Sequence, residues 1–131
     1  MSLYEWLLLL HLLAAFALVA GVASYGVIAF SGADAARRAL TPPAVVLWNA
    51  GSVGVILFGV WLALEVDGYE LWDGWIVAAI VLWLIASAAA GRLARVLREG
   101  AARTGAARGL VAVMGLASAA LLLDMIVKPG A

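Results

Sequence analysis

Cysteine is absent from this 131-residue chain, and histidine occurs once, at His11. Without cysteine the chain has no disulfides, no iron–sulfur clusters and no thiolate metal sites. Charged residues make up only 12% of the sequence, whereas 67% of the residues are hydrophobic. A soluble domain carries about twice that charged fraction, so the composition predicts a protein whose main partner is the lipid bilayer. The net charge of zero gives no reason to expect a nucleic-acid partner.

Four long apolar runs dominate the sequence. A helix that crosses the hydrocarbon core of a bilayer needs about 20 residues, and only a helix satisfies every backbone group within such a run. We therefore predict an all-α membrane protein: a single domain over residues 1–131 whose four transmembrane helices form an up-down-up-down bundle. The predicted spans are residues 3–30, 43–64, 75–91 and 109–127.

The connections between these runs predict where the helices begin and end. Residues 31–41 form the first connection, and Pro42-Pro43 follows it. Proline is well tolerated in the first turn of a helix, so we predict that the second helix begins there. In the third connection, residues 92–108, the arginines indicate a helical extension followed by a flexible turn around Gly100 and Gly105.

The charged residues predict the orientation of the chain. All seven arginines lie in the first and third connections, at Arg37, Arg38, Arg92, Arg95, Arg98, Arg103 and Arg108. The positive-inside rule places both connections in the cytoplasm and both termini outside. The tryptophans near the opposite boundary then predict an interfacial aromatic belt, formed by Trp6, Trp61, Trp72 and Trp75.

The first span resembles a signal peptide only in its position. It has no basic segment before it, carries Glu5 near its start and is too long for a signal peptide's apolar region, so we interpret it as retained. The abundance of alanine, glycine and arginine is typical of a GC-rich bacterial genome. We therefore expect a multi-pass protein of the bacterial inner (plasma) membrane.

Small residues four positions apart occur in every predicted span. Such pairs permit close contact between helices in lipid, where the hydrophobic effect gives little association energy. They predict tight packing inside the bundle and leave open whether the protein is a homo-oligomer. The pairs are Ala17 with Gly21, Ala50 with Gly54, Ser87 with Gly91, and Gly115 with Ala119.

His11 is the first candidate functional residue. It lies about two turns into the first span, where an imidazole is costly unless it finds a partner. The functional interpretations are axial haem ligation, metal binding and proton transfer. The structural interpretation is an interhelical hydrogen bond or a position near the lipid headgroups. No two-histidine zinc motif is present, and we predict no metal-ion site.

Asp124 and Lys128 are the second feature, because their spacing of four places them on one helical face. An ion pair that anchors the last span at the membrane interface would explain both residues. Alternatively, Asp124 pairs with His11, since both lie in the outer half of the membrane. We therefore define a candidate polar site near the outer face that consists of His11, Asp124 and Lys128.

A second group of polar residues is predicted near the inner side, at Ser24, Tyr25, Asn49 and Ser52. Asn49 is the most costly of them to place in hydrocarbon, so we predict that its side chain forms a hydrogen bond to another helix. Tyr25 lies several turns from His11 and cannot share one small site with it. We interpret this group as a structural clasp.

The two ends of the chain together resemble a known type of protein. The leucine-rich opening contains His11 and Gly21, and the last span ends with Asp124, Lys128 and Pro129. This layout resembles a family of small four-helix integral membrane proteins of bacteria. It is similar in plan to the copper-resistance D-type proteins and to the J-type protoporphyrinogen oxidase. In that oxidase the corresponding histidine and lysine are implicated in haem-associated function. The resemblance therefore implies a haem cofactor bound by His11 and Lys128.

Three functional interpretations remain open from the sequence. The first is a haem- or porphyrin-linked membrane oxidoreductase with His11 as ligand. The second is a small oligomeric transporter or channel in which Asp124 and His11 line a path. The third is a purely structural or assembly protein.

Overall fold

The computed structural model describes residues 2–31, 34–65, 73–99 and 104–127, and these residues are almost entirely helical. Its four helices are α1 (Leu3–Ser31), α2 (Asp34–Glu65), α3 (Gly74–Glu99) and α4 (Thr104–Val127). Each is long and apolar enough to cross a membrane. The prediction of an all-α four-helix transmembrane bundle is confirmed.

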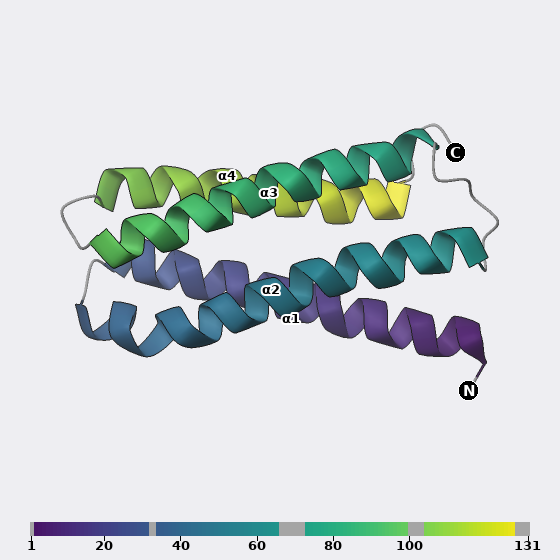
Figure 1. Cartoon of the computed structure of the whole chain (residues 1–131), viewed down its shortest axis with the longest axis horizontal. Coiled ribbons are helices and arrows are strands. Elements are labelled where there is room, and N and C mark those ends of the chain that lie inside the picture. The colour runs from purple at the N-terminus through teal and green to yellow at the C-terminus, as the bar shows by residue number, and fades with distance from the viewer. Residues whose placement is uncertain (1, 32–33, 66–72, 100–103, 128–131) are drawn as a thin grey trace.

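Consecutive helices run antiparallel (Figure 1). The start of α1 and the end of α4 lie at the same end of the bundle, which we call the terminal end. The opposite end carries Arg37 and Arg108, and we call it the arginine end. Helix α1 packs mainly against α2, and α3 mainly against α4, with fewer contacts between the two pairs. The bundle is therefore a pair of helix pairs.

The start of α2 differs from the prediction. Helix α2 begins at Asp34, so that Pro42 and Pro43 lie inside the helix instead of in its first turn. A proline removes the hydrogen bond to the carbonyl four residues earlier, which here belongs to Arg38 and Ala39. Both residues are exposed near the arginine end, where water can hydrate their carbonyls. Helix α2 therefore continues through the two prolines at an end of the bundle where water can replace the hydrogen bonds that they remove.

The third connection is partly as predicted. Helix α3 continues to Glu99, which confirms the helical extension past Arg92. Gly105, however, lies in the first turn of α4, so the predicted turn around it is wrong, and Gly100 lies outside the described residues. Burial of Ala107 explains the early start of α4, because packing of a helix face outweighs the low helix propensity of one glycine.

Glycines bring the backbones of α1 and α2 into direct contact. A Cβ placed on Gly51 would lie 2.3 Å from the backbone nitrogen of Leu18, and a Cβ on Gly21 would lie 2.8 Å from that of Trp48. Only residues without a side chain allow such an approach. Of the predicted small residues, Gly21 and Gly54 lie in this contact, whereas Gly91 has nothing within 4 Å of its Cβ position.

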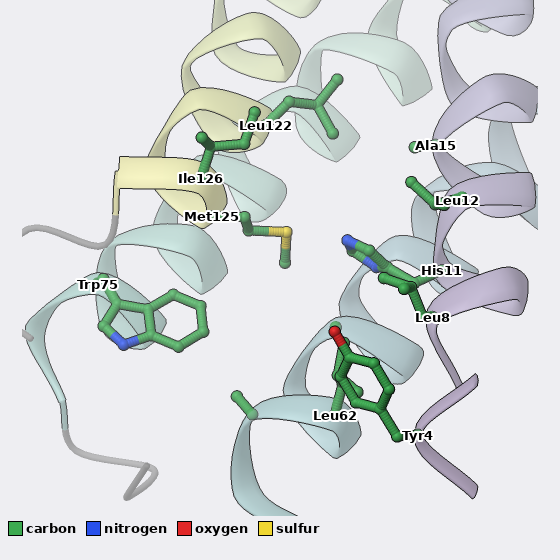
Figure 2. A pocket seen from close by; sticks show the side chains of 12 residues that line it. Tyr4, Leu8, His11, Leu12, Ala15, Leu62, Trp75, Leu122, Met125 and Ile126 are labelled. Carbon is green, nitrogen blue, oxygen red and sulfur yellow. The ribbon is translucent and has the colours of Figure 1, made fainter. Parts of the chain in front are cut away.

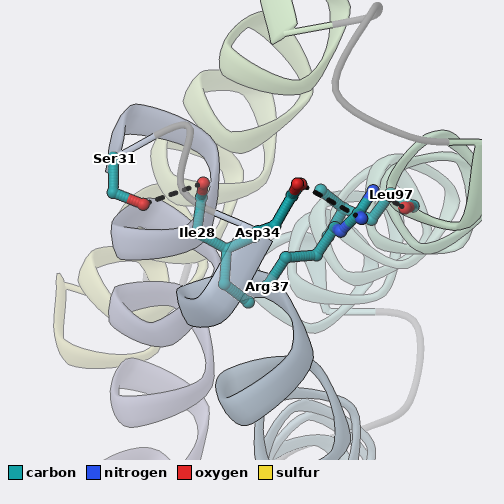
Figure 3. Close-up of polar contacts among 5 residues, drawn as sticks. All are labelled: Ile28, Ser31, Asp34, Arg37 and Leu97. Atoms are coloured by element: carbon teal, nitrogen blue, oxygen red, sulfur yellow. Dashed lines mark hydrogen bonds and ion pairs between the residues drawn. The ribbon is translucent and has the colours of Figure 1, made fainter.

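Two arginines join the helix pairs at the arginine end. Arg37 of α2 forms an ion pair with Asp34 at 3.2 Å and donates a 3.4 Å hydrogen bond to the carbonyl of Leu97 in α3 (Figure 3). Arg108 of α4 donates a 3.5 Å hydrogen bond to the carbonyl of Ala29 in α1. Both carbonyls lie in the last turn of their helices, which lacks intrahelical donors and attracts cations. The arginines therefore cap a helix of the neighbouring pair.

Candidate functional site

A cavity of about 480 Å³ lies in the terminal half of the bundle, and all four helices line it (Figure 2). Most of its lining is apolar. The larger aliphatic side chains in the lining are Leu8, Leu12, Leu62, Leu122 and Ile126. A largely apolar concave site with one or two polar atoms is typical of pockets for small ligands and cofactors.

His11 is the main polar residue of the cavity. Figure 2 shows its imidazole extending from α1 into the cavity, toward Met125 of α4. Its Nδ1 is fully buried and has no hydrogen-bond partner within the described part of the chain. This leaves Nε2 as the nitrogen available to a ligand in the cavity.

Gly59 of α2 lies beneath both His11 and Met125. A Cβ placed on Gly59 would lie 2.9 Å from Cε1 of His11, 3.2 Å from Nδ1 of His11 and 2.9 Å from Cε of Met125. The ring edge that carries Nδ1 therefore packs against the backbone of α2. Because Gly59 has no side chain, the cavity keeps an open floor between the imidazole and the thioether.

The aromatic residues of the cavity correct the predicted belt. Trp75 is only 2% exposed and lines the cavity from α3, so it does not belong to an interfacial belt. Trp6 and Trp61 are exposed, as residues facing lipid or headgroups would be. Trp72 lies outside the described residues. Tyr4 also lines the cavity but is substantially exposed, which places it at the rim.

Asp124 is buried in α4, yet it does not line the cavity that contains His11. Its Oδ2 is fully buried and has no hydrogen-bond partner in the described ranges. The next residue, Met125, occupies the position that faces His11. Lys128 lies outside the described residues, so the pairing of Asp124 with Lys128 or with His11 stays a prediction. Among the described side chains, no three His, Asp or Glu gather into a metal-ion site.

A second, smaller cavity of about 280 Å³ contains Tyr25, Asn49 and Ser52. Tyr25 is thus separate from His11, as the sequence predicts. Asn49 donates a 2.9 Å hydrogen bond to the carbonyl of Val45 within its own helix, so the predicted bond to another helix is wrong. A polar side chain can form its hydrogen bond to a backbone carbonyl of its own helix and then needs no partner on another helix.

Comparison of the chain with protein-family models, with curated proteins and with solved structures finds no match. The larger cavity therefore offers the chemistry from which a function can be inferred. Its apolar walls suit a bulky, membrane-soluble group, and its imidazole suits a group that accepts a nitrogen lone pair. Met125 and Gly59 complete the site, although neither residue type is distinctive in an apolar span.

Proposed function

We propose that the protein is a multi-pass protein of the bacterial inner membrane that binds haem in the larger cavity, with His11 as the ligand to the iron. The observation that carries this proposal is one imidazole facing an apolar cavity of about 480 Å³ that all four helices line. The resemblance of the chain's two ends to haem-associated membrane proteins supports the same interpretation.

The described residues fit this cofactor in two respects. The walls are apolar, as a porphyrin ring requires, and Gly59 leaves a floor without a side chain beside the imidazole.

Each part of the site has a distinct task in this proposal. Bound haem supplies one-electron redox chemistry, which the protein tunes through its axial ligands and the polarity of the cavity. His11 holds the iron and orients the ring. Leu122 and Ile126 form part of the apolar wall on α4. Lys128 follows the end of α4 directly, and its ammonium would balance an acidic group of the porphyrin or Asp124.

An absorption titration of the purified protein in detergent tests the role of His11. We expect wild-type protein to bind haem saturably and to give a Soret band. His11→Ala and the bulkier His11→Phe should bind haem at least about tenfold more weakly than wild type. Removing only the second-shell partner of a metal ligand already weakens metal binding about tenfold or more, and removing the ligand itself should cost at least as much. Asn49→Ala, in the smaller cavity, is the matched control and should bind normally. No saturable binding by wild type, or equal binding by both His11 variants, would refute the proposal.

The lack of cysteine makes the proposed orientation directly testable. Ser2→Cys and Ala106→Cys place single thiols at exposed positions near the terminal end and the arginine end, respectively. A membrane-impermeant maleimide should label Ser2→Cys in intact spheroplasts and Ala106→Cys only after lysis, because the arginines keep their end in the cytoplasm. The reverse labelling pattern would show that both termini are cytoplasmic.

A further inference from the structure

We infer that the smaller cavity is a binding site for a neutral, membrane-soluble ring that carries carbonyl oxygens, which is the chemistry of a quinone. Side chains of α1, α2 and α3 line this cavity, and His11 is not among them. The inference is therefore independent of the proposed haem site.

One aromatic side chain from each of the three helices lines the smaller cavity: Tyr25, Trp48 and Trp83. Tyr25 and Trp48 are only 2% and 4% exposed, and the backbone of Trp48 packs directly against Gly21 of α1. Aromatic side chains pack favourably against another ring, either stacked or edge to face. The volume of about 280 Å³ is near the lower limit of about 300 Å³ for small-ligand pockets. The walls therefore suit a single substituted ring.

The polar groups in this cavity are uncharged, and two hydroxyls lack a partner. Tyr25 and Ser87 form no hydrogen bond through their side chains within the described ranges, and neither hydroxyl oxygen is fully buried. Asn49 uses one amide N–H on the carbonyl of Val45 and keeps the other. None of the described lining residues is charged. Uncharged donors of this kind suit the carbonyl oxygens of a neutral ligand.

This arrangement differs from the structural clasp that the sequence predicts. Polar side chains within a membrane usually bond to one another or to backbone carbonyls. Tyr25 of α1 and Ser87 of α3 line the same cavity, yet they do not bond to each other. A ligand with two oxygen acceptors would supply a partner to each hydroxyl.

The smaller cavity opens sideways between α2 and α3. Val53 of α2 is 53% exposed, Gly91 of α3 is also exposed, and both residues line the cavity. Nothing lies within 4 Å of the Cβ position of Gly91. Nearer the arginine end, the hydrogen bond from Arg37 to Leu97 joins the same two helices (Figure 3). The open route thus leads to the hydrocarbon, so the ligand must dissolve in lipid, as a quinone with its apolar tail does.

Quenching of tryptophan fluorescence by decylbenzoquinone tests this inference, because Trp48 and Trp83 line the cavity. The purified protein is titrated in detergent without haem. We expect saturable quenching by wild type, above the linear effect of quinone dissolved in the micelles. Tyr25→Phe and Ser87→Ala each remove one hydroxyl, and each should weaken binding about two- to tenfold, as the loss of one hydrogen bond does.

Two matched controls remove a hydroxyl elsewhere. Ser24→Ala changes the neighbour of Tyr25, whose hydroxyl donates to the carbonyl of Ala20 in its own helix. Tyr4→Phe changes a tyrosine that lines the larger cavity. Both controls should bind the quinone like wild type. Equal affinity of wild type, Tyr25→Phe and Ser87→Ala would overturn the inference.

Two further ligands test the chemistry of the site. Decylbenzene has the same tail on a ring without carbonyl groups, and it should not displace the quinone. Dioctanoyl phosphatidylcholine carries ester carbonyls without a flat ring, and it should not displace the quinone either. Displacement by the first would show an unspecific apolar cavity, and displacement by the second would show a lipid site. Either result would overturn the inference.

The outcomes for the two cavities are separable. If wild type shows no saturable quenching, the quinone site fails and the proposed haem site is unaffected. If wild type binds the quinone but no haem, this inference is supported and only the proposed function fails.

Discussion

Replacing Gly51 with alanine is expected to separate α1 from α2 and to lower the free energy of unfolding by about 3 kcal/mol or more, at or above the upper end of the usual overpacking cost. The added Cβ would lie 2.3 Å from the backbone nitrogen and 2.6 Å from the Cα of Leu18. Both atoms belong to the backbone of α1, so no side-chain rotation can relieve the overlap. The helices would have to move apart, which also opens the contact between Gly21 and Trp48.

Unfolding in detergent, followed by circular dichroism during heating or titration with a denaturing detergent, measures this effect. Gly91→Ala in α3 is the matched control, since nothing lies within 4 Å of its Cβ position. The control should be as stable as wild type or more stable, because alanine favours the helix by up to about 1 kcal/mol. Equal stability of the two variants would show that α1 and α2 do not pack through their glycines.

Replacing Gly59 with leucine is expected to abolish haem binding while leaving the bundle folded. Here the overlapping atoms are the imidazole of His11 and the terminal methyl of Met125, each 2.9 Å from the new Cβ. These are the ends of side chains that border a cavity, so they can move aside without separating the helices. The leucine would then fill the space in which His11 and Met125 face each other.

Haem titration together with thermal unfolding distinguishes these effects. Gly59→Leu should unfold close to the wild-type temperature and give no saturable Soret change. Gly91→Leu adds the same side chain where the structure has open space, and it should bind haem like wild type. Wild-type haem affinity in Gly59→Leu would mean that the cofactor does not lie over Gly59. Gly51 and Gly59 belong to the same helix, yet one supports packing and the other supports the site.

The arrangement of contacts also links the cofactor to the fold. Arg37 and Arg108 connect the two helix pairs at the arginine end, whereas the larger cavity lies between the pairs at the terminal end. A group held by His11 of α1 in this cavity, which α3 and α4 also line, would join the two pairs at the terminal end. Any ligand that binds only the folded state also stabilises it by mass action.

The sequence by itself determined the helical bundle, because a continuous apolar run of about 20 residues can span lipid stably only as an α-helix. It also identified His11, since a lone imidazole in a leucine-rich span is costly wherever it points. Local signals were less reliable at helix ends. Pro42 and Gly105 predicted boundaries that the structure does not have, because exposure to water at the arginine end and burial of Ala107 outweighed them.

Only the tertiary structure decided what surrounds His11. The sequence offered Asp124 as one of two alternatives, a partner for Lys128 or for the imidazole, and in the fold the α4 residue that faces the ring is its neighbour Met125. Adjacent residues of a helix differ by about 100° in direction, so the choice between them depends on how α4 is rotated. That rotation results from packing against the other helices. For the same reason, no local signal marked Gly59 as the floor of the cavity or Trp75 as part of its wall.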